Sequence, residues 1–256
     1  MRNFGGEIKE PLGRVRYIRL CPVGTGTGWR IVFETPQGLA TLILVPDQHI
    51  AAPAAAQAKD ALGDKWQPLS DLWRTKQLQY TWLRGLMERH ADFWQVTGDA
   101  LDYAMASLKL DDAALRERLM GLYLRLHTYP EVKETLSRLK AGGMKLAILS
   151  NGAPSMLAAA AENSGIANFL DAIISVEELG IFKPHPSVYR LAASRLRHAP
   201  SEMCFLSSNA WDAHAAKACG YRVLWCNRFG QAPERIPEAP DAEITTLSAL
   251  PEIVGP

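Results

Sequence analysis

Hydrophobic and polar positions follow two different periods along the chain. From Lys145 onward, short apolar runs such as "KLAILS", "MCFLSS" and "YRVLWC" alternate with segments of helical pattern such as "SMLAAAAEN" and "AHAAKA". Alternation of buried strands with helices is typical of βαβ units and predicts an α/β fold with a parallel sheet. The loops "SNGAP", "FKPHP" and "SSNAWD" would then share the sheet edge at which ligands bind.

The middle of the chain, residues 64–127, has a continuous helical period instead. Apolar residues recur at helical spacing through "LSDLWRTKQLQYTWLRGL" and "DDAALRERLMGLYLRL", where Asp111 or Asp112 suits an N-cap. The pattern predicts a helical insertion between two parts of the α/β domain. Its aromatic residues, Trp82 and Tyr103 among them, are expected to pack inside that insertion.

The N-terminal segment, residues 1–46, differs from both. In "GWRIVFETPQGLATLILVP", two β-prone runs are joined by a segment in which Pro36 and Gly38 suit a tight turn. This predicts an antiparallel β-hairpin, unlike the opening strand of a parallel sheet. The predicted organisation is therefore an atypical N-terminal segment (1–46), an α/β core (47–63 and 128–256) and a helical cap (64–127).

Charge and composition favour a small-molecule ligand. Lys and Arg number 28 against 27 for Asp and Glu, so the net charge of +1 gives no reason to expect nucleic acid or a membrane surface as the main partner. The four cysteines have no C-x-x-C spacing, and no apolar run approaches the roughly 20 residues of a membrane span. We therefore expect a soluble, cytoplasmic protein with free thiols.

Two loops and one helix carry candidate chemistry. Ser150 and Asn151 lie between a strand and a helix, so they form either a simple N-cap or an anion pocket that uses backbone N–H groups as well. Lys183, in a loop with two prolines, either orients a carboxylate or is a solvated surface lysine. Arg74, beside bulky apolar residues, is either an exposed helix arginine or a binder of a leaving anion.

The loop "SSNAWD" crowds polar groups at the end of one strand. Ser207, Ser208, Asn209 and Asp212 occur within six residues, yet Asp212 is the only carboxylate among them. Mg²⁺ normally requires more oxygen charge than that. The loop therefore predicts a site that positions water or substrate without a metal.

These segments together resemble a known family. The stretches "LWRTKQLQYTWLR", "DFWQVTGDAL", "LAILSNGAP", "FKPHPSVY" and "FLSSNAWDA" resemble the (S)-2-haloacid dehalogenases, or L-2-haloacid dehalogenases, of the haloacid dehalogenase superfamily, in order and spacing from about His49 to Leu247. The resemblance implies a Rossmann-like core with a helical cap. It also implies hydrolysis of a small 2-haloalkanoic acid, such as 2-chloropropionate, to the 2-hydroxy acid with inversion, without metal or cofactor. A homodimer is expected by analogy.

The resemblance also implies roles for individual residues. Arg74 would stabilise the departing halide, Ser150 and Asn151 would hold the substrate carboxylate, and Lys183 would orient the nucleophile. Asp212 would place or activate water. The nucleophile would be supported by Tyr189, Ser207 and Asn209. The alkyl group would be surrounded by an apolar wall formed by Leu78, Phe93 and Trp211.

The family's nucleophile motif, D-x-Y-G-T, is absent from the chain. Asp47 follows "TLILVP" and precedes a predicted helix, so it is the better substitute, although Ala51 stands where the family has Thr. The segment "DQH" also resembles an Asp-Val-His that follows the family's nucleophile, which would make Asp47 a different aspartate. Glu34, after "RIVF", is the second candidate.

Three explanations of this departure stay open. The N-terminus was replaced by a fusion, a frameshift or a misplaced start; or the chain uses Asp47 or Glu34; or it is a catalytically silent relative.

Two other functions are alternatives to dehalogenation. One is a module that binds a small carboxylate without turnover. The other is a metal-dependent phosphatase of the same superfamily, which the sequence disfavours because phosphatases usually carry an Asp where Asn209 stands.

Overall fold

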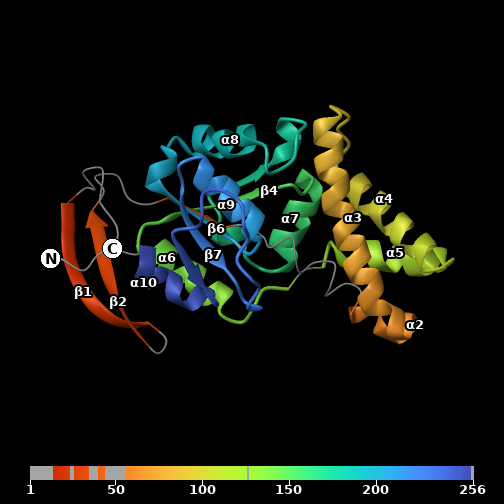
Figure 1. Cartoon of the computed structure of the whole chain (residues 1–256), viewed down its shortest axis with the longest axis horizontal. Helices are drawn as coiled ribbons and strands as arrows, with labels where there is room; N and C mark the ends of the chain where they lie inside the picture. The colour runs from red at the N-terminus through yellow and green to blue at the C-terminus, as the bar shows by residue number, and fades with distance from the viewer. Residues whose placement is uncertain (1–13, 24–25, 35–39, 44–55, 126, 255–256) are drawn as a thin grey trace.

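The computed structural model describes residues 14–23, 26–34, 40–43, 56–125 and 127–254, the first three ranges by their backbone. Figure 1 shows a sheet in the middle of the molecule, with helices packed around it and the helices α2, α3, α4 and α5 grouped at one end. The parallel sheet and its covering helices agree with the predicted α/β fold class, and α3, α4 and α5 belong to a separate helical group.

The core contains a six-stranded sheet in the order β5-β4-β3-β6-β7-β8. Every neighbouring pair in it is parallel, which confirms the predicted α/β class with a Rossmann-like core. The short strand β8 was not predicted. The strands are Ala40–Ile43 (β3), Lys145–Ser150 (β4), Ala172–Ser175 (β5), Met203–Ser207 (β6), Arg222–Cys226 (β7) and Ala242–Ile244 (β8).

Alternate residues of each strand face two different helical layers, as the pleat of a strand requires. In β4, Leu146 and Ile148 pack with residues of α6 and α10, whereas Ala147 and Leu149 pack with residues of α8 and α9. Both faces of the sheet are therefore apolar, which explains the continuous apolar runs of the sequence. The helices are Val132–Ala141 (α6), Pro186–Leu196 (α8), Ala210–Ala218 (α9) and Leu250–Val254 (α10).

The connecting segments follow local rules of helix termination. Helix α7 (Pro154–Asn163) is followed by Gly165 with φ of +67°, and α9 by Gly220 with φ of +87°. Glycine accepts this left-handed conformation without strain and so suits the end of a helix. Two short elements, α2 (Lys59–Leu62) and the 3-10 helix η2 (Gly63–Lys65), lie beside the cap helices, where Arg118 of the cap bonds Asp60 (Figure 1). The core contains the 3-10 helices η3 (Ala167–Phe169), η4 (Val176–Glu178), η5 (Pro200–Glu202) and η6 (Leu247–Ala249).

The cap consists of α3 (Trp66–Leu86), α4 (Phe93–Ser107) and α5 (Ala113–Leu122). The Asp92 side chain accepts a hydrogen bond from the Gln95 N–H at 2.8 Å, and Asp112 accepts one from the Leu115 N–H at 2.9 Å. Each carboxylate satisfies a backbone donor at the start of a helix. Asp112 is thus the N-cap, as one of the two predicted alternatives had it.

Two cap aromatics correct the sequence-based expectation. Trp82 and Tyr103 are 39% and 44% exposed, so they are not buried packing residues. The apolar stripe of α3 passes through Leu69 and Trp73 instead. Trp82 meets the ring of Trp211 edge-on, with centroids 5.7 Å apart. Helical spacing indicates that these rings lie on helices, but it does not indicate which residues each face of a helix contacts.

The front of the chain also differs from the predicted hairpin. Strand β1 (Arg14–Val23) pairs antiparallel with β2 (Gly26–Glu34), and β3 pairs in parallel with β4 and β6. The hairpin predicted across Pro36 and Gly38 is therefore wrong, because β2 and β3 join different sheets. A Pro- and Gly-containing loop ends a strand but does not select its partner. Since β3 precedes residue 47, the core sheet also begins earlier than predicted.

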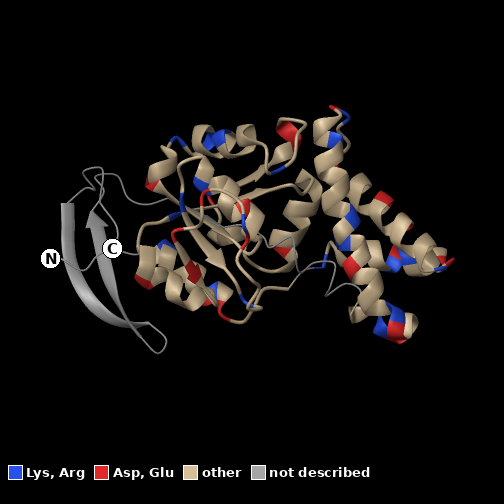
Figure 2. Cartoon of the chain, viewed as in Figure 1, with Lys and Arg blue, Asp and Glu red and all other residues tan. Residues whose placement is uncertain are grey.

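Charges of both signs are interspersed over the helices in the view of Figure 2, and the strands between them are largely uncharged. Among residues 56–125 and 127–254, no helix combines the length and apolarity needed to cross a membrane. Nor does the described part of the chain contain a group of His, Cys, Asp or Glu residues arranged to bind a metal ion.

Candidate active site

The carboxyl ends of β4 and β6 meet on either side of β3. Ser150 is the last residue of β4 and Ser207 the last of β6, and Ile43, where β3 ends, lies opposite Leu206. The chain continues from β3 to β4 on one side, while β6 lies on the other. This edge is therefore a topological switch point, where parallel sheets bind their ligands.

Asp212 is the centre of a buried polar cluster at this edge. Its Oδ2 accepts hydrogen bonds from Ser207 Oγ at 2.9 Å and from Lys183 Nζ at 3.2 Å, and its Oδ1 accepts one from the Tyr189 hydroxyl at 2.6 Å. The side chains of Lys183 and Asp212 are each 2% exposed. A buried charge is stable only when it is paired and hydrogen-bonded, and both conditions hold here.

Lys183 is fixed by three elements of the core. Its Nζ donates to the Leu149 carbonyl at 2.9 Å, and its own N–H donates to Asn151 Oδ1 at 2.9 Å. The ammonium also lies 5.3 Å from the centroid of the Phe205 ring. The alternative of a solvated surface lysine is therefore wrong. The side chain is held beside β4, the neighbour of β3, in one orientation.

Tyr189 is an uncharged hydrogen-bond donor in the cluster. Burial raises the pKa of its hydroxyl well above the usual value, and the negative charge of Asp212 raises it further. The ring lies against Phe205, with centroids 5.7 Å apart. Tyr189 therefore stays protonated and acts as a hydrogen-bond donor to the carboxylate.

The loops after β4 and β6 are built alike. Ser150 Oγ accepts from the Gly152 N–H at 3.1 Å, and Ser207 Oγ accepts from the Asn209 N–H at 3.1 Å. In each loop a strand-terminal serine hydroxyl bonds the backbone two residues later. Ser150, Asn151, Ser207 and Asn209 are all at most 3% exposed. Both amide residues are thus held beneath the surface, at the edge of the sheet.

Arg74 reaches this edge from the cap. Its Nη1 donates to Gln77 Oε1 at 2.8 Å, and its Nη2 lies 3.4 Å from Asn209 Oδ1, across the boundary between cap and core. The second distance is long for a hydrogen bond, but charge strengthens the contact. Arg74 is half-buried rather than a freely exposed helix arginine.

The three apolar candidates lie on elements that bound the same region. Leu78 follows Arg74 by one helical turn on α3, and the Phe93 ring lies 6.2 Å from that of Phe182, the neighbour of Lys183. Trp211 on α9 contacts Trp82 of the cap. The structure thus brings cap and core aromatics together here.

The two candidate nucleophiles differ in position. Asp47 lies outside the described residues, four positions after Ile43 in the sequence. Glu34 ends β2, whose partner is β1 in the two-stranded antiparallel sheet. Glu34 therefore does not follow a strand of the parallel sheet, as a nucleophile at this edge would.

Sequence reasoning missed Gln77 and the contact of His90 with Glu177. Gln77 is 1% exposed on the apolar face of α3. The signal was a glutamine three residues after Arg74, at a position where the helical period calls for an apolar residue. His90 Nε2 lies 2.8 Å from Glu177 Oε2 and joins the cap to η4. No local pattern links these two, because they are 87 residues apart.

Comparison with known proteins gives consistent results. The family model of haloacid dehalogenase-like hydrolases matches residues 26–220. The (S)-2-haloacid dehalogenase 4A of Burkholderia cepacia is 44% identical over 182 residues, which are 71% of this chain and 79% of that protein.

Two solved structures extend the likeness to the fold. The crystal structure of a dehalogenase superimposes with a TM-score of 0.82 at 37% identity, covering 87% of this chain and 100% of the other. The L-2-haloacid dehalogenase from Xanthobacter autotrophicus with chloropropionic acid covalently bound gives 0.78 at 34% identity, covering 85% and 98%. With the parallel sheet, the inserted helices and the buried cluster around Asp212, these matches establish that the chain belongs to the haloacid dehalogenase-like hydrolases, among the (S)-2-haloacid dehalogenases.

Proposed function

We propose that this chain hydrolyses small (S)-2-haloalkanoic acids to (R)-2-hydroxy acids. The observation that carries the proposal is the meeting of two fixed cations at one sheet edge: Lys183 from the core, and Arg74 from the cap, 3.4 Å from Asn209. A 2-haloacid presents a carboxylate and a leaving halide. The first needs donors, and the second needs a positive charge that is strongest as the halide departs.

The reaction would run through an ester of the enzyme. A carboxylate oxygen attacks C2 of the substrate, the carbon–halogen bond breaks, and the halide leaves with the bonding electron pair. Attack from the side opposite the halide inverts C2. Water then adds to the acyl carbon of the ester, so the ester C–O bond to the enzyme's carbonyl carbon breaks and the 2-hydroxy acid is released. The covalent chloropropionic acid in the relative from Xanthobacter autotrophicus supports an intermediate of this kind.

Asp47 is the proposed nucleophile. It follows the central strand β3 in the sequence, and β3 lies between the strands that carry Ser150 and Ser207. Of the three N–H donors of the Lys183 ammonium, two are directed to Leu149 and Asp212. The third would hold the attacking carboxylate ionised and oriented. Tyr189, Ser207 and Asn209 would support this lysine through the cluster around Asp212.

The remaining groups would handle substrate and water. Ser150 and Asn151 would bind the substrate carboxylate with hydroxyl, amide and backbone donors. Arg74 would stabilise the halide, with Leu78, Phe93 and Trp211 around the alkyl group. Asp212 would place or activate the water that cleaves the ester. Because Asp212 accepts three hydrogen bonds, its oxygens would be open to a water molecule only when Lys183 or Ser207 shifts toward the intermediate.

The test is incubation of the purified chain with (S)- and (R)-2-chloropropionate, with chloride and lactate measured together. We expect equal amounts of chloride and (R)-lactate from the (S) substrate and no reaction of the (R) substrate. A chain that binds (S)-2-chloropropionate, seen as a rise in melting temperature, but releases no chloride would instead be a carboxylate-binding relative. Cleavage of p-nitrophenyl phosphate with Mg²⁺ would favour a phosphatase.

A cytoplasmic location and a homodimer complete the proposal. Both rest on composition and on analogy with the family. Cell fractionation and light scattering of the purified protein test them.

A further inference from the structure

We propose that Gln77 is a positioning residue that locks the guanidinium of Arg74 toward the core. The inference deepens the proposed function and rests on it for its kinetic consequence. The geometric part concerns one side chain holding another, and it can be tested in the absence of any turnover.

Gln77 is a buried amide in the middle of the cap. Its Oε1 accepts from Arg74 Nη1 at 2.8 Å, and its Nε2 donates to Thr97 Oγ1 at 2.8 Å and to the Tyr123 hydroxyl at 3.3 Å. Gln77, Thr97 and Tyr123 are at most 2% exposed. An amide in such surroundings must satisfy its donors and acceptor within the protein, since water does not reach it.

The orientation of this amide follows from its partners. Arg74 has only donors, so the atom facing it must be the oxygen. On the other side, Thr97 Oγ1 donates its proton to the Phe93 carbonyl at 2.6 Å, which leaves the hydroxyl oxygen as an acceptor for an N–H group. Both ends of the amide therefore demand the same arrangement. The wrong flip would set two donors against each other at Arg74.

The partners of Gln77 are themselves fixed by the cap. The Trp73 indole donates from Nε1 to the Thr97 carbonyl at 2.9 Å, and its ring lies 5.1 Å from that of Tyr123. The network thus connects α3, α4 and Tyr123, which follows the last residue of α5. Arg74 is consequently braced against all three cap helices through one amide.

Packing alone does not require a glutamine here. Methionine has nearly the same shape, would fill the site and would avoid the desolvation of an amide. What methionine lacks is the acceptor for Arg74. A long, half-buried arginine with one bond fewer samples more rotamers, and a cation displaced by about 1 Å loses much of its effect on a departing halide.

The first experiment measures the rotation of the Arg74 guanidinium. In ¹⁵N NMR spectra, with the Arg74 signal assigned from Arg74→Lys, we expect slow rotation about the Nε–Cζ bond in the wild type and fast, averaged rotation in Gln77→Met. Gln77→Glu keeps the oxygen acceptor and should keep rotation slow. Thr81→Val is the matched control, because Thr81 is buried on the same face of α3 but donates to the Leu78 carbonyl instead.

The second experiment compares leaving groups. If Gln77 acts through Arg74, Gln77→Met lowers kcat/KM for 2-chloropropionate by about 10- to 100-fold and lowers it less for 2-bromopropionate, because bromide needs less stabilisation. A purely structural role would lower both equally, as we expect for any effect of Thr81→Val.

The positioning role of Gln77 and the proposed function can be disproved independently of each other. Unchanged slow rotation in Gln77→Met would overturn the positioning role whether or not the chain is active. Absence of halide release from the wild type, with rotation responding as described, would overturn the proposed function and leave the positioning role standing.

Discussion

The core side and the cap side of the candidate site hold their cations by different means. In the core, Lys183 is paired with an opposite charge, and both side chains are only 2% exposed. In the cap, Arg74 is half-buried and is held by the neutral oxygens of Gln77 and Asn209. The positive charge of Lys183 is compensated by Asp212 in the core. The amides that bind Arg74 are neutral, so these two bonds bring it no negative charge.

Because of this difference, substitutions on the two sides should affect stability and catalysis to different extents. Removal of one member of the core pair leaves the other buried and unpaired, which destabilises the fold as well as the site. Removal of the cap cation takes a donor away from the neutral amides of Gln77 and Asn209, which costs less than leaving a buried charge unpaired. We therefore expect core substitutions to affect unfolding and turnover together, and cap substitutions to affect mainly turnover.

The largest effect is expected from Lys183→Met. With Asp212 left buried without its cation, the free energy of unfolding should fall by about 3–5 kcal/mol, measured by urea titration. Halide release should become undetectable. The control is Lys217→Met, which removes a half-exposed partner of Asp241 at 2.6 Å and should cost at most about 1 kcal/mol. Equal losses in the two variants would contradict the contrast between buried and exposed pairs.

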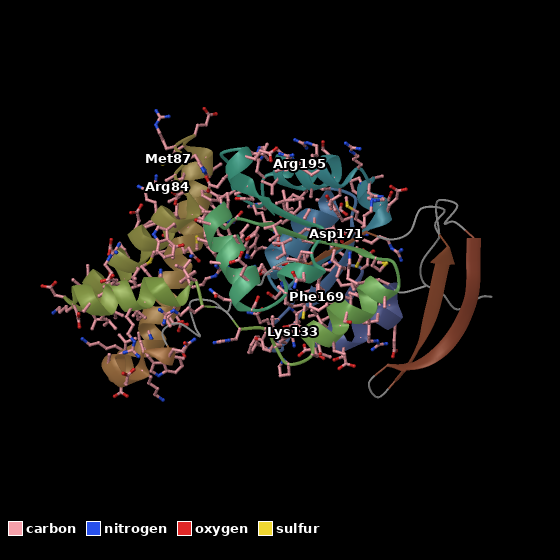
Figure 3. The ribbon with its side chains drawn as sticks, turned by 180° about the vertical axis from the view of Figure 1, so that it is seen from behind. Arg84, Met87, Lys133, Phe169, Asp171 and Arg195 are labelled. Atoms are coloured by element: carbon pink, nitrogen blue, oxygen red, sulfur yellow. The ribbon has the colours of Figure 1, made fainter. Side chains whose placement is uncertain are left out.

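Arg74→Met should have the next largest effect. Unlike Lys183→Met, it should lower activity much more than stability. We expect kcat/KM for (S)-2-chloropropionate to fall by about 10²- to 10³-fold, while unfolding changes by about 1–2 kcal/mol because Gln77 loses a partner. Arg84→Met is the matched control on the same helix, since Arg84 bonds Asp99 at 2.9 Å near the end of α3 (Figure 3). A stability loss as large as that of Lys183→Met would remove the distinction between the two sides.

Tyr189→Phe removes one donor from the core cluster and leaves its charges in place. Loss of a buried hydrogen bond to a carboxylate should lower the free energy of unfolding by about 1.5–3 kcal/mol. Activity should fall by about tenfold as Asp212 loses part of its orientation. Tyr221→Phe, which loses a hydroxyl bonded to the Tyr189 carbonyl at 2.7 Å, should lower stability without a comparable loss of turnover. Similar kinetic losses would refute a specific role for Tyr189.

The smallest effect concerns pH and lies away from the site, at Asp171 (Figure 3). Burial raises the pKa of Asp171, but hydrogen bonds from Lys140 Nζ and the Leu146 N–H outweigh it, so the pKa is lowered from 3.8. Its ionised form therefore contributes stability above the unfolded pKa that is lost as pH falls through the folded pKa.

Because the Asp171 side chain is 37% exposed, the contribution should not exceed about 1 kcal/mol. Urea titrations from pH 7 to about pH 3 should show a shallower acid decline for Asp171→Asn than for the wild type. Equal slopes would mean that the surface pair contributes nothing measurable, and activity at pH 7 should be unchanged in either case.

Much of the core could be predicted from the sequence because its signals are local. The runs that form β4, β6 and β7 are short and apolar, and each is followed by a polar loop. Parallel pairing then brings the ends of neighbouring strands to one edge. This geometry explains why Lys183 and Asp212, which are 29 residues apart, could be assigned to one site before their contact was known.

The features that were missed depend on partners distant in sequence. Strand β3 was assigned to a hairpin because nothing within it distinguishes an antiparallel neighbour from β4 and β6. Gln77 bonds residues 20 and 46 positions away. The short strand β8 has only three residues, too few for a periodic pattern. Trp82 contacts Trp211 of the core, and the helical period of α3 does not indicate which residue of the core Trp82 meets.

The account depends most on a carboxylate nucleophile, and isotope transfer tests it most directly. A single turnover of (S)-2-chloropropionate by excess enzyme in ¹⁸O water should place ¹⁸O in the peptide that contains Asp47, while the lactate hydroxyl receives unlabelled oxygen from the enzyme. Labelled lactate together with an unlabelled Asp47 peptide would mean that water attacks C2 directly, and it would contradict the account.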